Sequence, residues 1–129
     1  MSMTNFTEDL VLDWLLTANS ATRPSAWYIG LFTAAPSDTG GGTEVSTGSY
    51  ARQAVTFTVS GTAPTQAVNS ANIDYPTASG SWGTITHAAV FDASTSGNML
   101  WWGALSSSVA IATNDIFRWP ASSFVLTLD

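Results

Sequence analysis

The sequence predicts an all-β fold: an antiparallel, jelly-roll-like β-sandwich of about eight strands with one N-terminal amphipathic helix. Two observations predict it. From residue 26 onward, every periodic segment alternates apolar and polar side chains with a period of two. The gaps between these segments are rich in Gly, Ser, Pro and Asn, and no helical spacing interrupts them. This combination favours an antiparallel sandwich or barrel.

The one segment with helical spacing lies near the N-terminus. Asn5 followed by Glu8 resembles a capping box, which predicts a helix over about residues 6–18. Leu12 and Leu16 widen its apolar stripe. The simplest interpretation is a helix packed on the protein's own sheet, and the alternative is a contact with another molecule. The stripe consists of Phe6, Leu10, Val11, Trp14, Leu15 and Ala18.

Period-two alternation places the expected strands along the rest of the chain. They span residues 26–33, 51–60, 71–75, 82–92, 98–106 and 124–128, with shorter strands around residue 109 and over 116–119. Residues 92–98 separate two strong strands and predict a hairpin loop. The whole chain, 1–129, is therefore expected to form a single domain, with the helix at 6–18 and the sandwich at 26–128.

The composition favours a protein that works inside an assembly. Charged residues make up 9% of the 129 residues, against roughly 25% in an average soluble protein. A surface of Ser, Thr, Asn and Gly is cheaper to desolvate than one of lysines. The formal charge of −6 repels nucleic acid and anionic membranes, so neither is an expected partner. No apolar run approaches the about 18 residues of a membrane span, and the acidic N-terminus lacks the basic region of a secretory signal.

The residues that carry catalysis are sparse, so no enzyme, cofactor or metal site is expected. His87 is the only histidine, and on its strand it shares a face with Ile85, Ala89 and Phe91, which favours a core position. The chain has no cysteine for a zinc site. Its nine acids are scattered singly, whereas a glycoside hydrolase needs two facing each other across a cleft. The sequence leaves that third function class open.

The glycines at 40–42 and Arg52 are residue types that occur together in anion-binding sites. A phosphate loop runs from its glycines into a helix, but residues 54–59 alternate as a strand, so a connecting loop is predicted. Residues 34–49 are long for such a connection and are expected to be mobile in a free monomer and to lie near a subunit contact. Arg52 is expected to pair with an acid or with backbone carbonyls, within its subunit or across to another, and to hold the base of the loop.

Trp101 and Trp102 are adjacent on one expected strand, so their side chains point to opposite faces of the sheet. One of them fits the core. The other needs a cover, which a second layer within the monomer, a subunit interface or a sugar stacked on the indole would provide. The candidate interface residues are therefore Trp14, Gly40, Gly41, Gly42, Glu44, Tyr50, Arg52, Trp101 and Trp102.

Several sequence blocks resemble a family of small virion structural proteins of tailed bacteriophages. They are WYIGLFTAAP at 27–36, EVS at 44–46, GSYARQ at 48–53, SWGTITH at 81–87, VFD at 90–92, LW at 100–101, GAL at 103–105 and DIFR at 115–118. The resemblance runs from the helix to the C-terminus. Members are often labelled tail fibre proteins, and similar small β-sandwich proteins act as cement, or decoration, on capsids.

The resemblance implies a protein that is assembled into the virion in the host cytoplasm and released by lysis. The expected role is a capsid cement protein on the outside of the head, acting as a homotrimer that binds the major capsid protein or other virion proteins. A symmetric oligomer would multiply weak contacts through effective concentration. The alternative is a tail fibre or baseplate component that contacts host-surface glycans.

Overall fold

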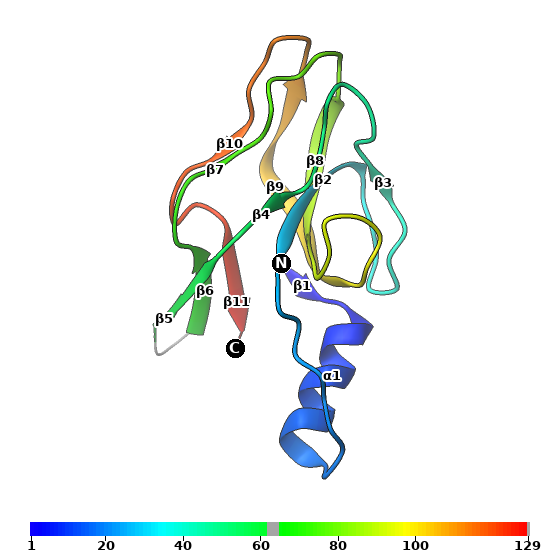
Figure 1. Cartoon of the computed structure of the whole chain (residues 1–129), viewed down its shortest axis with the longest axis vertical. Coiled ribbons are helices and arrows are strands. Elements are labelled where there is room, and N and C mark those ends of the chain that lie inside the picture. Colours follow the sequence, from blue (N-terminus) through cyan, green and yellow to red (C-terminus); the bar gives the residue numbers. More distant parts are fainter. Residues whose placement is uncertain (62–64, 129) are drawn as a thin grey trace.

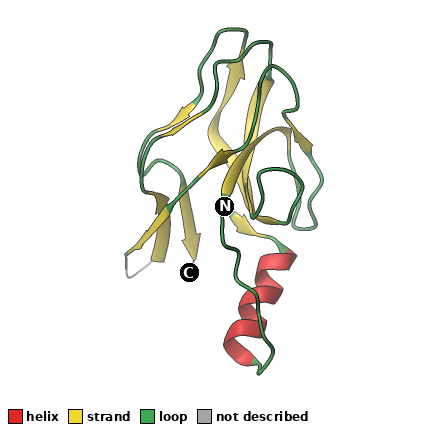
Figure 2. Cartoon of the chain, in the orientation of Figure 1, coloured by secondary structure: helices red, strands yellow, loops and turns green. Residues whose placement is uncertain are grey.

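A computed structural model describes residues 1–61 and 65–128 as two layers of antiparallel strands with a projecting helix (Figures 1 and 2). The larger layer is a six-stranded sheet. Its main strand order is β1-β9-β8-β2-β3, and the sixth strand, β4, pairs with the same edge of β2 as β3 does. The strands are β1 (Ser2–Met3), β2 (Tyr28–Ala34), β3 (Thr43–Glu44), β4 (Gln53–Ala54), β8 (Gly83–Phe91) and β9 (Met99–Ile111).

The second layer consists of two small sheets. Three strands pair in the order β11-β6-β5, and β10 pairs with β7. Their bounds are β5 (Phe57–Ser60), β6 (Thr65–Asn69), β7 (Ile73–Asp74), β10 (Arg118–Trp119) and β11 (Val125–Leu128). Every strand pair is antiparallel, so the predicted all-β class with an N-terminal helix is confirmed.

The main core lies between the two layers. Ile29, Leu31, Ile85 and Val90 from the large sheet are almost completely buried, and Phe124 closes the core from the other side. A second, smaller cluster lies on the outer face of the large sheet, where Phe32, Ala89 and Phe91 pack against Met99 and Trp102. The large sheet therefore buries apolar side chains on both faces, and the loops that cover its outer face form the candidate site.

The helix α1 (Asn5–Leu16) begins one residue earlier and ends two residues earlier than predicted. Its N-cap is Thr4, not the predicted Asn5, because the Thr4 hydroxyl accepts the backbone N–H of Thr7 at 3.4 Å. Thr7 is its only buried residue, and α1 projects away from both layers (Figure 1). The interpretation of a helix packed on its own sheet therefore holds only for the start of α1, which contacts β1 and β9, and it is wrong for the C-terminal half, where most of the apolar side chains are exposed.

The predicted strands differ from the structure mainly where the chain changes layers. The predicted strand at 51–60 is divided, since β4 pairs in the large sheet and β5 pairs in the small one. The predicted strands at 98–106 and near 109 are one strand, β9. The strand β6 was not expected, because only two neighbouring residues, Ala67 and Val68, are apolar there. No helix in the described residues is long and apolar enough to span a bilayer.

Candidate functional site

Arg52 joins two loops that cover the outer face of the large sheet. Its Nε and one terminal nitrogen donate to the two carboxylate oxygens of Glu44, each at 2.8 Å. Its other terminal nitrogen donates to the carbonyls of Ala93 at 3.0 Å and Ser96 at 2.7 Å. The guanidinium carbon lies 3.4 Å from the centroid of the Phe91 ring. The structure thus shows the expected pairing of Arg52, made within its own subunit.

Tyr50 supports the same ion pair from inside the sheet. Its hydroxyl donates to Glu44 Oε1 at 2.8 Å and accepts the backbone N–H of Leu31 at 2.9 Å. Burial, with a smaller contribution from the charge of Glu44, raises the pKa of Tyr50 far above its ordinary value. The phenol therefore stays neutral and keeps donating to the carboxylate.

Gly30 makes room for this network. A Cβ at position 30 would lie 2.8 Å from Glu44 Oε1 and 3.1 Å from the Phe91 ring. Only glycine lets the carboxylate approach β2 so closely. The sequence analysis missed Gly30, although an isolated glycine inside a strand pattern is a known signal of close approach.

The three consecutive glycines form the return from β2 to β3. Ser37 and Gly40 exchange two backbone hydrogen bonds of 2.9 Å, which close a tight turn. Gly42 has φ of +76°, and a Cβ there would lie 2.7 Å from the backbone nitrogen of Pro36. The predicted connecting loop is confirmed, because the glycines lead into a strand. The mobility expected for residues 34–49 stays a prediction.

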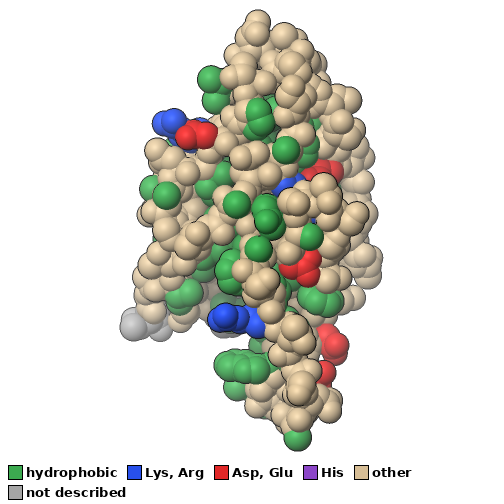
Figure 3. Space-filling view, viewed as in Figure 1, with side chains coloured by type: hydrophobic (Ala, Val, Ile, Leu, Met, Phe, Trp, Pro, Cys, Tyr) green, Lys and Arg blue, Asp and Glu red, His purple; other side chains and the backbone are tan. Residues whose placement is uncertain are grey.

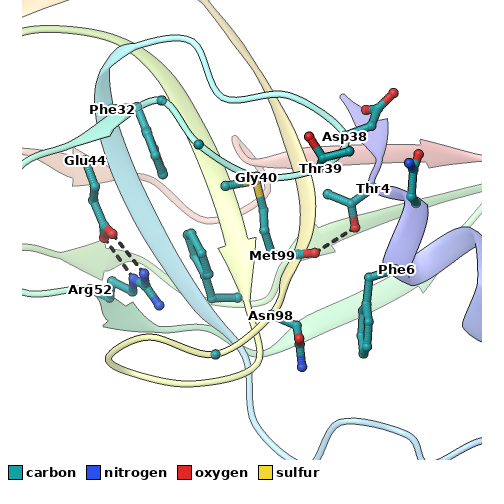
Figure 4. A pocket seen from close by; sticks show the side chains of 15 residues that line it. Thr4, Phe6, Phe32, Asp38, Thr39, Gly40, Glu44, Arg52, Asn98 and Met99 are labelled. Carbon is teal, nitrogen blue, oxygen red and sulfur yellow. Dashed lines mark hydrogen bonds and ion pairs between the residues drawn. The ribbon is translucent and has the colours of Figure 1, made fainter.

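A cavity of about 450 Å³, here called the glycine pocket, opens beside this loop (Figure 4). Figure 4 shows the Glu44 and Arg52 pair at one side and the first residues of α1 at the other. Its polar groups are largely paired already, since Asp38 accepts a hydrogen bond of 2.8 Å from the Trp102 indole. The lining residues include Thr4, Asn5, Phe6, Phe32, Asp38, Thr39, Gly40, Gly41, Gly42, Glu44, Arg52, Asn98 and Met99.

The first turn of α1 is fixed to the large sheet. The Thr4 hydroxyl donates to the carbonyl of Met99 at 2.6 Å, and the Thr7 hydroxyl donates to the carbonyl of Leu100 at 2.8 Å. The backbone N–H of Thr4 also donates to the carbonyl of Leu100 at 3.0 Å, and that of Asn5 donates to the carbonyl of Asp38 at 3.1 Å. These bonds hold α1 as an extension of the sheet. Beyond them, four apolar side chains stand in solvent: Leu12 at 55%, Trp14 at 71%, Leu15 at 64% and Leu16 at 71% exposure.

Trp101 and Trp102 point to opposite faces of β9, as predicted. Trp102 packs in the outer cluster, and Trp101 packs against the main core. Trp101 also lines a second cavity of about 330 Å³, here called the inter-sheet groove. Among residues 1–61 and 65–128, those that line this groove carry no charge, and Figure 3 shows apolar side chains along the middle of the molecule and on the helix below. The lining is Trp27, Phe57, Val59, Thr65, Gln66, Ala67, Val90, Leu100, Trp101, Leu126 and Leu128.

Of the residues considered for catalysis, Asp38 and Glu44 line the glycine pocket, while His87 and Asp74 line neither cavity. His87 Nδ1 is 2.8 Å from the Thr86 hydroxyl, and the His87 ring lies 6.2 Å from that of Trp102. Asp74 forms an ion pair with Arg118 on the far small sheet. Within residues 1–61 and 65–128, no three His, Asp or Glu side chains gather in a way that could hold a metal ion.

The nine candidate interface residues therefore fall into three places. Five line the glycine pocket, namely Gly40, Gly41, Gly42, Glu44 and Arg52. Tyr50 supports that pocket through Glu44, and Trp102 does so through Asp38. Trp101 lies in the inter-sheet groove, and Trp14 lies on the exposed end of α1.

Comparison with known proteins adds a family to this geometry. The family model described as Podophage GP4 fiber I protein gp80 matches residues 2–127. No curated protein matches the chain. Because the match spans the helix, both layers and both cavities, the chain belongs to the podophage GP4 fiber I protein gp80 family of phage virion structural proteins.

Proposed function

We propose that the chain is a structural subunit of a tail fibre, which is held in place by contacts with other virion proteins. The observation that carries this proposal is the exposed end of α1. Four large apolar side chains stand more than half exposed on a helix whose first turn is fixed to the sheet. Exposed apolar surface of this kind marks a protein contact.

The fibre description of the family supports a tail fibre over the capsid cement expected from the sequence. The glycan contact that was part of the tail fibre alternative has little support from the geometry. Among the six tryptophans only Trp14 is largely exposed, and it belongs to the apolar surface of α1. The proposed partners are therefore proteins, with no role for nucleic acid, membrane or cofactor.

The proposed role involves no catalysis. Glu44 is bound by Arg52, and Asp74 is bound by Arg118, so neither carboxylate is free to act as a general acid or base. Incubation of the purified protein with host surface polysaccharide is expected to release no reducing ends. Turnover that persists through purification and is lost in a double carboxylate variant would contradict this part of the proposal.

Immunogold labelling of intact virions tests the location. We expect gold particles on the tail, and none on virions grown without the gene for this chain. Gold distributed over the head would favour the capsid cement role and would contradict the tail fibre proposal. The experiment needs no assumption about how copies of the chain associate.

A further inference from the structure

We propose that the exposed end of α1 in one copy of the chain docks into the inter-sheet groove of a second copy. The arm surface is defined as Leu12, Trp14, Leu15 and Leu16. The proposal concerns the contact between copies, so it is independent of whether the protein lies on the head or on the tail.

The arm cannot cover the groove of its own chain. Hydrogen bonds from Thr4 and Thr7 to the carbonyls of Met99 and Leu100 fix the first turn of α1. From there the helix leads away from both layers (Figure 1). Folding back would break these buried bonds and leave their polar groups without partners, which is costly. The occupant of the groove must therefore come from outside the chain.

The groove matches the arm in chemistry. Its floor is formed by nearly buried apolar side chains, including Val90, Leu100 and Leu126. At its rim, Val59 is 69% exposed and Leu128 is 49% exposed. Of the three acids of α1, Glu8 and Asp9 precede the arm and Asp13 lies within it, and no described lining residue of the groove carries a charge that would repel them. An amphipathic helix in an apolar groove is a recurrent mode of recognition.

A second copy is the partner that explains both surfaces at once. Eleven large apolar side chains are exposed on the described residues, and six of them belong to the arm or to the groove rim. Docking covers these six together without a further protein. The other five are Met1, Phe6, Val109, Ile116 and Val125.

The contact is head-to-tail, because different surfaces meet on the two copies. The arm side chains expose on the order of 400 Å², which is about half of the 800 Å² per partner that a stable interface buries. Each copy, however, donates one arm and receives another when such a chain of contacts closes into a ring. Closure thus doubles the buried surface per copy, and a ring of three would be the homotrimer expected from the sequence.

Light scattering after size-exclusion chromatography tests the contact with matched substitutions to aspartate. We expect the wild-type full chain to be oligomeric, and both the arm variant Leu15→Asp and the rim variant Val59→Asp to be monomeric. The control is Ile116→Asp, because Ile116 is 64% exposed but lies outside both surfaces. It should assemble like the wild type. Circular dichroism should show all four proteins folded, since every substituted side chain is exposed.

Mixing the two defective proteins distinguishes arm-in-groove docking from packing of arms on arms. Leu15→Asp retains an intact groove, and Val59→Asp retains an intact arm, so their mixture at high concentration should form a one-to-one heterodimer that is held by a single contact and is weaker than the wild-type oligomer. The proposal is overturned if the wild type stays monomeric at the highest soluble concentration, if Val59→Asp assembles normally, or if the mixture shows no new species.

Disulfide trapping provides a second readout that does not depend on charge. The chain has no native cysteine, so a Leu15→Cys and Val59→Cys double variant can be oxidised without side reactions at other thiols. We expect a covalent dimer or larger ladder on a non-reducing gel. A Leu15→Cys and Ile116→Cys variant should give much less. Equal cross-linking of the two variants would contradict the proposed contact.

Discussion

At the level of single residues, the Arg52 clamp shows how one side chain fixes a surface built from distant segments. The planar guanidinium meets both oxygens of Glu44 and two carbonyls of the 92–98 hairpin at once. Its side chain is only 8% exposed, and that of Glu44 is 25% exposed. Solvent screens this pair much less than it screens a pair on the surface. The clamp therefore holds β3 and the hairpin in a fixed relation.

We predict that Arg52→Ala lowers the free energy of unfolding by about 3 kcal/mol, because it leaves a half-buried carboxylate and two carbonyls without their donor. Arg52→Lys should recover little, since an ammonium cannot form the same fork. Urea denaturation measures both. The control is Arg118→Ala, which removes an exposed ion pair with Asp74 and should leave the stability nearly unchanged. An effect of Arg52→Ala as small as the one expected for Arg118→Ala would contradict the role of the clamp.

Stability should fall at alkaline pH because of Tyr50 and Tyr75. Burial is the main cause that raises the pKa of each phenol above its ordinary value of 10.0. In the unfolded chain both lose protons near pH 10, whereas the folded chain keeps them, so the unfolded state binds fewer protons. The contribution is complete below about pH 10 and is lost above it. Urea midpoints should therefore begin to drop near about pH 10 and continue to fall above it, and Tyr50→Phe should show a smaller drop. An unchanged slope in that variant would contradict the assignment.

At the level of elements, sequence periodicity predicted the long strands β8 and β9 well, because the alternation there persists over many residues. It failed at 51–60, where the alternation continues through a change of layer. Val55 is buried and lies between β4 and β5, so no interruption of the pattern marks the crossing. The helix was predicted at nearly the right place, but an apolar stripe does not say which molecule will cover it.

Asn69 joins the small three-stranded sheet to the loop before β11. It is fully buried, and its amide donates to the carbonyls of Ala71 at 2.9 Å and Pro120 at 2.8 Å. Its side-chain oxygen accepts the N–H of Phe124 at 2.9 Å. We predict that Asn69→Ala costs about 3 kcal/mol, because the buried N–H of Phe124 and two partly buried carbonyls lose their partner. Hydrogen exchange should become faster in β5, β6 and β11. Asn72→Ala is the control, since the hydrogen bond that its side-chain oxygen accepts from the backbone N–H of Ala121 is exposed and should matter less.

At the level of the whole molecule, the candidate site is formed by the order of the strands. The order β1-β9-β8-β2-β3 brings the start of α1, the glycine loop and the 92–98 hairpin to one side of the large sheet. Local sequence patterns marked Gly40 to Gly42 and Arg52 as notable. They could not place Asp38 beside Trp102 or Phe91 beneath Arg52, because those contacts depend on which strands become neighbours.

The net negative charge of the chain leads to a final prediction, which concerns how salt affects its self-association. Copies that each carry a net charge of −6 repel one another, whereas neither the arm nor the groove contains an ion pair that salt could weaken. Raising sodium chloride from about 0.1 M to about 1 M screens the repulsion. We therefore expect the dissociation constant of the oligomer to fall by a few-fold, and we expect the oligomer to weaken on cooling, as apolar contacts do. Dilution series by light scattering at each salt concentration and temperature measure both effects.

The Ile116→Asp variant is the control, because its added charge should increase the salt effect without abolishing assembly. Dissociation of the wild-type oligomer by salt would show that charged groups hold the copies together and would contradict the docking of the arm in the groove.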